Sequence, residues 1–357
     1  MGARLRSLDV LRGLTVALMI LVNNGVGSPQ FHQLQHSAWN GLTLCDLVFP
    51  LFLFMVGVSV WLSRKRLTPR KIVTRTLRLF LVGVLLHVWD QCLDGEWAFW
   101  PGLRLWGVLQ RIALCYAAAA FMVYYGRGRH LTMAAGGALV LYALLLYYGN
   151  GYAPDESNLL CRVDRWLVGE AHLYRKSPID PEGLLGTLPA IAHTLIGVLV
   201  GKGVESLKSL GSLRSLGPLG AVGAAMTAAG LMLSLWLPLN KRIWSPSYVL
   251  VTCGLATLLL LLLIGLERSK PSLPRVFTSS LPHLFIAFGM NAFFLYVLRE
   301  LLAPVVGHLG LNQTIYEAML GGGFDPRMAS LCYALLFDGF IALVAWALWK
   351  RQIFVKV

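Results

Sequence analysis

The chain has 357 residues, of which 57% are hydrophobic and 13% are charged, and its formal net charge is +14. Soluble domains carry roughly 25% charged residues, so the composition excludes an ordinary soluble protein and predicts an integral membrane protein. The basic excess would also suit a nucleic-acid-binding protein. The distribution of the charges argues against that, because most of them lie between apolar segments at the ends of spans.

Apolar segments long enough to cross a bilayer recur along the whole chain. A helical span needs about 20 residues, and ten segments are predicted to span, the third of them short: 8–26, 43–63, 79–92, 105–125, 131–149, 187–203, 218–238, 247–266, 281–303 and 328–349. We therefore expect an all-α integral membrane protein, a polytopic bundle of about ten transmembrane helices that forms a single domain, 1–357, in the lipid bilayer.

The positions of the basic residues predict the orientation of this bundle. With ten spans both termini lie on one side, and that side also holds most of the basic residues, including a run in the predicted inner loop 64–78. Positive charge stays on the cytoplasmic side during insertion, so both termini are predicted to be cytoplasmic. The net charge then reflects topology, and no nucleic-acid partner is expected. Two outer loops, 27–42 and 150–186, are long enough to be functional.

The first predicted span contains unusual polar residues. Charges within spans are costly and usually mark a pathway, a partner pair or a site. Arg12 and Asn23 are eleven residues apart, which at 100° per residue places them on nearly the same helix face. Asp9 and Arg12, three residues apart, can pair on that face, as an ordinary salt bridge or as part of a site. We expect a polar stripe along this helix from its inner to its outer end.

His36 and Asp46 lie just before and at the start of the second span, on the predicted outer face. Imidazole takes and gives protons near neutral pH, so His36 is a predicted catalytic base. Asp46, ten residues later, would orient the ring, or alternatively would cap the second span. The side-chain amides of Asn23 and Asn40 would be able to donate hydrogen bonds to the oxyanion that develops in an acyl transfer. Asn23 is therefore predicted to be a catalytic residue together with His36 and Asp46.

Polar residues also interrupt later spans: Gln110 and Arg111 in the fourth, Asn291 in the ninth and Asp338 in the last. Arg111 and Asp338 would pair to hold helices together, or they would line a wet channel through the bundle. These alternatives stay open from sequence.

Lys241 and Arg242 lie on the predicted outer side and break the positive-inside pattern. Two basic residues there suit an anionic sugar or a phosphate. Trp39 and Trp244 offer flat faces for a sugar ring, or they are ordinary interfacial anchors.

The six cysteines show no metal-ligand spacing, so no metal site is expected. Most are predicted to be small packing residues. Cys92 and Cys161 both fall near the outer face and would be able to form a disulfide in an oxidising compartment.

Taken together, these segments resemble the heparan-α-glucosaminide N-acetyltransferase family of transmembrane acyltransferases. The similarity spans nearly the whole chain and keeps the order of the motifs, which are Arg6-Ser7-Leu8-Asp9-Val10-Leu11-Arg12-Gly13, Val22-Asn23, His36-Ser37-Ala38-Trp39-Asn40-Gly41-Leu42-Thr43, Asp46-Leu47-Val48-Phe49-Pro50, Gln110-Arg111, Asp180-Pro181-Glu182-Gly183-Leu184-Leu185-Gly186-Thr187 and Trp244-Ser245-Pro246-Ser247.

The resemblance implies an acetyltransferase that uses cytoplasmic acetyl-CoA to acetylate the amine of a glucosamine-type sugar on the other side of the membrane. The catalytic histidine of the family's His-x-x-Trp-Asn-Gly motif corresponds to His36. Candidate contacts of an amino-sugar or glycosaminoglycan-derived acceptor are Asn40, Trp39, Lys241, Trp244, Asp180 and Glu182. Candidate contacts of acetyl-CoA are Arg12, Gln110, Arg111 and Asn291.

The resemblance also bears on context. Lysosomal members of the family suggest a homodimer. The length of this chain is similar to that of bacterial relatives, so the bacterial inner membrane is the expected location. The alternative function is an amino-sugar transporter, because a solvated channel and the positive-inside pattern fit both classes.

Overall fold

The computed structural model describes residues 5–97, 100–126, 128–174, 177–210, 216–269 and 281–355. Within these ranges the regular structure is helical and no strand is present. The chain forms two compact units. Unit 1 consists of Met1–Ser37, Thr43–Val48 and Leu259–Val357, and unit 2 consists of Ala38–Leu42 and Phe49–Leu258. That the two units work as a single domain stays a prediction.

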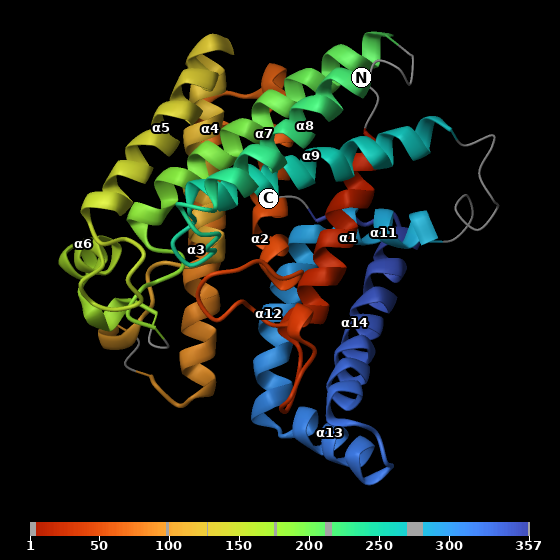
Figure 1. The fold of residues 1–357 in the computed structure, drawn as a ribbon. Helices are drawn as coiled ribbons and strands as arrows, with labels where there is room; N and C mark the ends of the chain where they lie inside the picture. Colours follow the sequence, from red (N-terminus) through yellow and green to blue (C-terminus); the bar gives the residue numbers. More distant parts are fainter. Residues whose placement is uncertain are drawn as a thin grey trace. The chain divides into compact units, whose positions relative to one another are not determined.

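The helices confirm a polytopic helical membrane protein (Figure 1). Among the described residues, eight helices or helical segments are long and apolar enough to cross a membrane: Cys45–Arg66, which contains α2 (Val48–Ser63), α3 (Pro69–Leu93), α4 (Val108–Tyr125), α5 (Gly128–Tyr148), Leu184–Leu207 within α7 (Leu184–Leu210), α8 (Leu216–Leu233), α9 (Pro246–Arg268) and α14 (Pro326–Lys350). A ninth candidate is the pair α11 (Leu281–Met290) and α12 (Ala292–His308), which is bent by 77°. The remaining predicted span is α1 (Arg6–Asn23), whose charges set it apart from the others.

The predicted inner loop 64–78 is wrong over most of its length. Helix α3 begins at Pro69, ten residues before the predicted span, and the Thr68 side chain accepts a hydrogen bond from the Lys71 amide at 3.3 Å. Threonine at the N-cap followed by proline is a common helix start. The basic residues after it lie on exposed helix surface, so their charge does not interrupt the helix even though it ends the apolar pattern.

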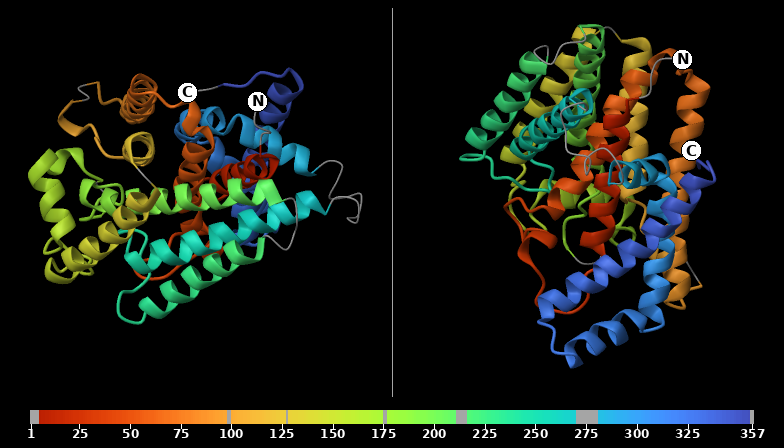
Figure 2. Two further views of the ribbon diagram at one scale, coloured as in Figure 1. Left: turned by 90° about the horizontal axis from the view of Figure 1, so that it is seen from above. Right: turned by 90° about the vertical axis from the view of Figure 1, so that its right-hand side faces the viewer.

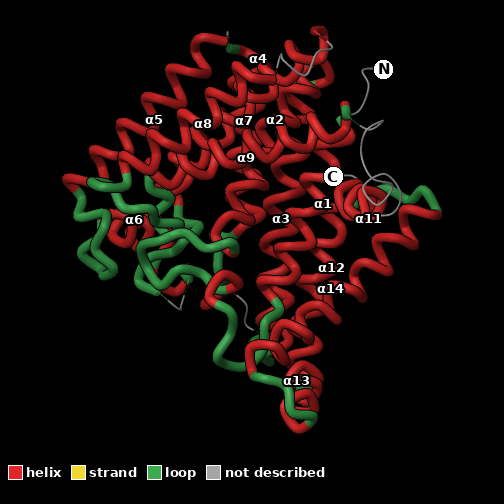
Figure 3. The backbone as a smooth tube through the Cα atoms, turned by 45° about the vertical axis from the view of Figure 1, so that its right-hand side comes forward, coloured by secondary structure: helices red, strands yellow, loops and turns green. Residues whose placement is uncertain are grey.

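In unit 2, α5 and α4 pack on α7, and α3 packs on α4. Helices α7, α8 and the first part of α9 lie side by side (Figure 2). The predicted outer loop 150–186 contains a short helix, α6 (Leu159–Val168), whose apolar face buries Leu160 and Cys161. The loops of this unit gather next to α6 (Figure 3), and backbone bonds between them include Gly41 N–H to the Leu239 carbonyl at 2.8 Å and Leu105 N–H to the His172 carbonyl at 3.1 Å.

In unit 1, α1 packs against α11 and α14. Gly13 and Gly289 stand at the crossing of α1 and α11, where a Cβ on either residue would overlap a carbonyl oxygen of the opposite helix. The crossing is therefore a backbone-to-backbone contact that only glycine permits. A further helix, α13 (Leu311–Gly321), joins α12 to α14.

The break between α11 and α12 falls at Asn291, a fully buried residue. Its Nδ2 donates to the Ile353 carbonyl at 3.0 Å, and its Oδ1 accepts from the Val355 N–H at 3.0 Å. The side-chain amide of Asn291 therefore ties the segment after α14 to the bend.

Candidate functional site

The structure brings His36 and Asp46 together in unit 1. His36 Nδ1 lies 2.8 Å from Asp46 Oδ1. The imidazole side chain is 51% exposed, whereas the carboxylate side chain is 1% exposed. Because a carboxylate only accepts hydrogen bonds, it favours the tautomer with the proton on Nδ1, and the ring then presents the lone pair of Nε2. This pair has the chemistry of a general base on an accessible loop.

Asp46 closes the loop that carries His36. Its Oδ2 accepts from the backbone N–H groups of Ser37 at 3.1 Å and Thr43 at 3.2 Å. Both donors precede Asp46 in the chain, so the carboxylate organises the loop instead of capping α2. The local turn continues with the short 3-10 helix Cys45–Leu47, in which the Asp46 N–H donates to Thr43 Oγ1 at 3.3 Å.

Cys45 also contacts the histidine, a contact that the sequence does not reveal. Its Sγ lies 3.2 Å from Nδ1 and 3.7 Å from Nε2 of His36, and the residue is buried. The thiol therefore packs against the imidazole beside Asp46.

The other predicted residues of unit 1 have different surroundings. The predicted Asp9–Arg12 ion pair is confirmed at 3.2 Å, and Arg12 Nη1 also lies 3.5 Å from the Gly289 carbonyl oxygen. Asn23 is exposed at the end of α1, and its Nδ2 donates to the Met19 carbonyl of its own helix at 2.9 Å. Asn291 has both of its amide groups bonded to backbone. The structure thus gives no support to an oxyanion role for Asn23 or a cofactor role for Asn291.

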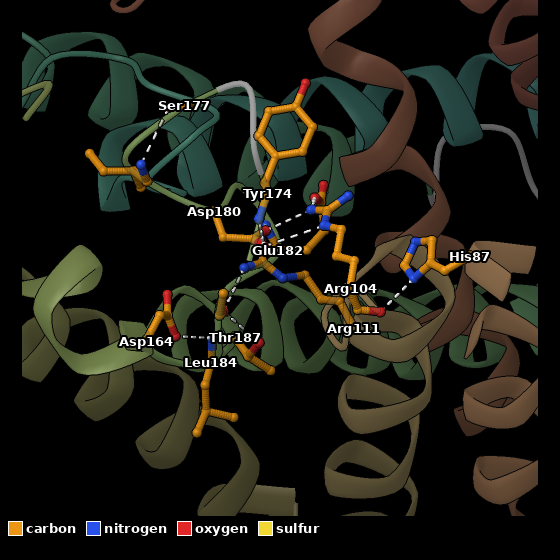
Figure 4. A network of polar contacts seen from close by, with 12 residues as sticks. His87, Arg104, Arg111, Asp164, Tyr174, Ser177, Asp180, Glu182, Leu184 and Thr187 are labelled. Atoms are coloured by element: carbon orange, nitrogen blue, oxygen red, sulfur yellow. Dashed lines mark hydrogen bonds and ion pairs between the residues drawn. The ribbon is translucent and has the colours of Figure 1, made fainter. Parts of the chain in front are cut away.

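In unit 2 a network of charged side chains holds the turn at residues 180–183 (Figure 4). Arg104 Nη2 lies 2.7 Å from Asp180 Oδ1 and 2.6 Å from Glu182 Oε2. Asp180, which is buried, also accepts from the N–H groups of Tyr174 and Glu182, each at 2.9 Å. Asp180 therefore organises the turn, and its predicted contact with substrate finds no support.

The charges of this network shift pKa values in opposite directions. Burial alone would lower the pKa of Arg104, but the carboxylates of Glu182 and Asp180 raise it above its ordinary value. Burial alone would raise the pKa of Glu182, but Arg104 and Arg111 lower it. Both groups are therefore charged at neutral pH, and the pairs are charge-assisted hydrogen bonds.

Arg111 lies beneath the same turn. It is 2% exposed, and its Nη2 donates to the Gly183 carbonyl at 2.9 Å. Its Nε and Nη1 are buried and have no hydrogen-bond partner. The guanidinium carbon lies 5.3 Å from the centre of the Trp244 ring. The side chain therefore keeps unused donors in a buried position, which is rare in proteins.

Asp164 is a buried carboxylate in α6 that the sequence analysis missed. Its Oδ1 accepts from the Leu184 N–H at 2.8 Å, at the start of α7, while its Oδ2 is buried and without a partner. Burial raises the pKa of Asp164 to about 6. The sequence did contain a signal for Asp164. It lies three and four residues after Cys161 and Leu160, so it shares the apolar face of the amphipathic helix α6 with them.

Trp244 is not an open surface for a sugar, and it is not an interfacial anchor. It is 1% exposed, and its ring packs edge-on against Phe49, His193 and Tyr248 at centroid distances of 5.1 to 5.9 Å. Neither predicted role agrees with this environment, because the buried ring has no face open to a sugar or to the membrane interface.

The remaining predicted contacts of unit 2 lie among its loops or in its core. Trp39 Nε1 donates to the Tyr152 carbonyl at 3.0 Å, and Asn40 Oδ1 accepts from Asn240 Nδ2 at 3.1 Å. Lys241 lies close enough to Glu182 to lower its pKa. Gln110 is buried at the start of α4, and its Nε2 has no hydrogen-bond partner.

The sequence left open whether Cys92 and Cys161 pair, and in the structure both residues are free thiols. Cys161 packs instead in an apolar cluster with Leu160, Ile179 and Ile243.

The helical, polytopic chain is a multi-pass membrane protein, and its histidine–carboxylate pair lies on the loop before one of the spans. The sequence profile described as heparan-alpha-glucosaminide N-acetyltransferase, catalytic, matches residues 4–237. The chain belongs to this family, which confirms the resemblance inferred from its motifs.

Two curated relatives are similar over nearly the whole chain. The mouse (Mus musculus) and human (Homo sapiens) proteins named heparan-alpha-glucosaminide N-acetyltransferase are each 27% identical to it, over 99% of this chain. The chain spans 60% of the length of each relative.

Proposed function

We propose that this protein is a transmembrane N-acetyltransferase that moves an acetyl group from cytoplasmic acetyl-CoA to the amine of a glucosamine-type sugar on the outer side of the membrane. The observation that carries the proposal is the His36–Asp46 pair, which lies in the motif segment where the family resemblance places the catalytic histidine. The names of the mouse and human relatives support the choice of reaction and acceptor.

The chemistry follows from the tautomer that Asp46 favours. The acceptor nitrogen attacks the thioester carbonyl, an N–C bond forms and the C–S bond breaks. His36 Nε2 takes the proton that the amine loses and returns it to the departing thiolate of CoA, so atoms and charge balance. Asp46 stabilises the imidazolium that forms between these two events. A route in which the imidazole itself carries the acetyl group uses the same nitrogen.

Acetyl-CoA carries phosphates, which require cationic groups on the cytoplasmic side. The exposed side chains of Lys71, Arg75 and Arg78 recur with helical spacing near the start of α3, and side chains three or four residues apart share a helix face. In unit 1, Arg12 is partly exposed beside Asp9. These basic side chains suit phosphate groups as point charges or as paired donors.

The test is acetylation of glucosamine by purified protein reconstituted in vesicles with labelled acetyl-CoA. We expect labelled N-acetylglucosamine from the wild type and a loss of about 100-fold or more in rate for His36→Ala. His32→Ala is the matched control, because His32 is an exposed histidine on the same loop. The proposal is lost if the wild type forms no acetylated sugar, or if His36→Ala is as fast as the control.

One observation favours the alternative of an amino-sugar transporter. The α11–α12 pair is bent by 77° at a buried polar residue, as a broken span or a re-entrant loop would be, and discontinuous helices are common in transporters. Uptake of labelled glucosamine into vesicles without acetyl-CoA separates the two functions. Uptake that persists in His36→Ala, with no acetylated product from the wild type, selects transport.

A further inference from the structure

A pocket opens in unit 2 where the consecutive spans α4 and α5 are joined by a short turn. Its volume is about 650 Å³, and small-molecule sites typically occupy roughly 300–1,000 Å³. The residues that line it come from the end of α4, the turn and the start of α5: Phe121, Met122, Tyr125, Gly126, His130 and Leu131. A turn between two spans lies at the membrane surface, so the pocket is at the boundary between lipid and water.

Aromatic side chains form the α4 wall of the pocket. The rings of Phe121 and Tyr125, one helical turn apart, lie nearly parallel with their centroids 6.3 Å apart. Tyr124 packs edge-on against Tyr125 at 4.7 Å, and Tyr125 is 72% exposed. Exposed tyrosines at the end of a span are typical of the depth at which lipid headgroups meet acyl chains. The wall therefore lies where a phospholipid changes from apolar to polar.

Three side chains that can donate to a phosphate gather at the turn. Arg129 and His130 are exposed in the first turn of α5. Lys202, which is exposed on α7, reaches the same turn: its Nζ lies 2.8 Å from the position that a Cβ on Gly128 would occupy. Guanidinium and ammonium groups are the usual partners of phosphate oxygens in proteins.

Carboxylates do not balance these charges. Helices α4 and α5 contain no Asp or Glu. On α7, Glu205 lies three residues after Lys202, but it pairs with Arg64 at 2.9 Å and accepts from Trp61 Nε1 at 2.8 Å. The turn therefore keeps an excess of positive charge. Basic pockets between spans are suited to anionic lipid headgroups.

An exposed apolar stripe continues from His130 along α5. Met133, Gly137 and Val140 follow at steps of three or four residues, so they share one helix face. Met133 is 70% exposed and Val140 is 63% exposed. A Cβ on Gly136 or Gly137 would meet no atom within 4 Å. The two glycines therefore leave open space against the helix, in which an extended acyl chain can lie.

We propose that the pocket between α4 and α5 binds an anionic phospholipid. The phosphate is held by Arg129, His130 and Lys202, the aromatic wall contacts the glycerol region, and an acyl chain follows the exposed stripe of α5. The stripe favours a lipid over a nucleotide, because a nucleotide in the pocket would leave it uncovered. This inference does not depend on the proposed acetyl transfer.

The test compares the binding of two lipids to the full-length protein in detergent by native mass spectrometry. The probes are phosphatidylglycerol and phosphatidylcholine with the same acyl chains. We expect phosphatidylglycerol to bind about 10-fold more tightly or better. Arg129→Gln and Lys202→Gln should each weaken its binding about fivefold and leave phosphatidylcholine unaffected. Arg162→Gln is the matched control, because Arg162 is an exposed arginine on α6 of the same unit.

A further variant tests the acyl stripe without changing any charge. Gly137→Leu fills the open space on α5 and should weaken the binding of both lipids about fourfold or more, the loss expected when even one CH2 group leaves its contact. Gly339→Leu, at an open position of α14, is its control. Both leucines point into open space, so both proteins should fold, which thermal unfolding checks.

Three results would overturn the inference. Equal binding of the two lipids by the wild type would mean that the pocket holds ordinary boundary lipid, and this result requires no variant. Displacement of phosphatidylglycerol by inorganic phosphate would identify a simple anion site, and displacement by acetyl-CoA would identify a nucleotide site. Affinities of the Arg129, Lys202 and Gly137 variants within twofold of their controls would equally exclude the proposed lipid site.

Discussion

Replacing Asp46 by asparagine keeps the shape of the side chain but exchanges one acceptor oxygen for an amide donor. In the wild type, Oδ2 accepts from two backbone N–H groups, of Ser37 and Thr43, while Oδ1 faces His36 Nδ1. The asparagine carbonyl has to stay with the two backbone donors. Its NH2 group then faces the imidazole and makes Nδ1 an acceptor, so the proton moves to Nε2.

The substituted enzyme therefore presents the wrong tautomer, because Nε2 has no lone pair to take the proton of the amine. A general base contributes about 10²- to 10⁴-fold to a rate, which corresponds to about 2.7–5.4 kcal/mol of barrier. We expect the kcat of Asp46→Asn to fall within that range. The KM for acetyl-CoA should change little, because the proposed CoA contacts are elsewhere.

The assay is the initial rate of N-acetylglucosamine formation at saturating acetyl-CoA, with thermal unfolding in detergent as the folding control. The melting temperature should stay close to that of the wild type, since the loop keeps its backbone hydrogen bonds. A folded Asp46→Asn protein with a rate within threefold of the wild type would refute the tautomer argument and leave Asp46 as a structural residue of the loop.

Three further substitutions test the fold. Gly289→Ala should lower the free energy of unfolding by about 1–3 kcal/mol through overpacking at the α1–α11 crossing, whereas Gly339→Ala, at an open position of α14, should change it little; both are measured by thermal or denaturant unfolding. Arg104→Gln should cost about 3–5 kcal/mol because it leaves buried carboxylates unpaired, and Arg165→Gln, whose partners are exposed, should cost less than about 1 kcal/mol. Asp164 binds a proton more tightly when folded, with a pKa of about 6 against an ordinary 3.8, so wild-type stability should fall as the pH rises from 4 to 7. Between pH 4 and 7 the fall relative to Asp164→Asn should be roughly 2.4 kcal/mol, and parallel stability–pH curves for the two proteins would contradict it.

The spans and the histidine pair were accessible from sequence for clear reasons. The thickness of the bilayer fixes the length of an apolar segment that can cross it. Hydropathy therefore locates the spans, and each predicted span has a helical counterpart in the structure. His36 and Asp46 are ten residues apart in a loop, and a loop of that length brings its ends together at low entropic cost. The start of α3 was missed because charged side chains on an exposed helix face hide the helix from hydropathy, although Thr68-Pro69 marked it.

The environment of single side chains was much less accessible. Trp244 and Asn291 were placed by residue type alone, as a sugar platform and a cofactor ligand. Their surroundings depend on contacts with segments distant in sequence: the ring packs on Phe49 and His193, and the amide bonds residues 353–355. Asp164 was missed for the same reason, since its role arises only where α6 meets the start of α7.

The bond between Asn291 and the segment after α14 has a consequence for how the protein is made. The two backbone partners of Asn291 are 62 and 64 residues further along the chain. At a synthesis rate of roughly 5–20 residues per second, the ribosome delivers them about 3–13 s after Asn291 itself. During that interval Asn291 lacks the two hydrogen bonds to residues 353 and 355. The angle between α11 and α12 is therefore free to adjust while α13 and α14 are synthesised. The arrival of residues 353 and 355 then fixes an angle that membrane insertion alone leaves open.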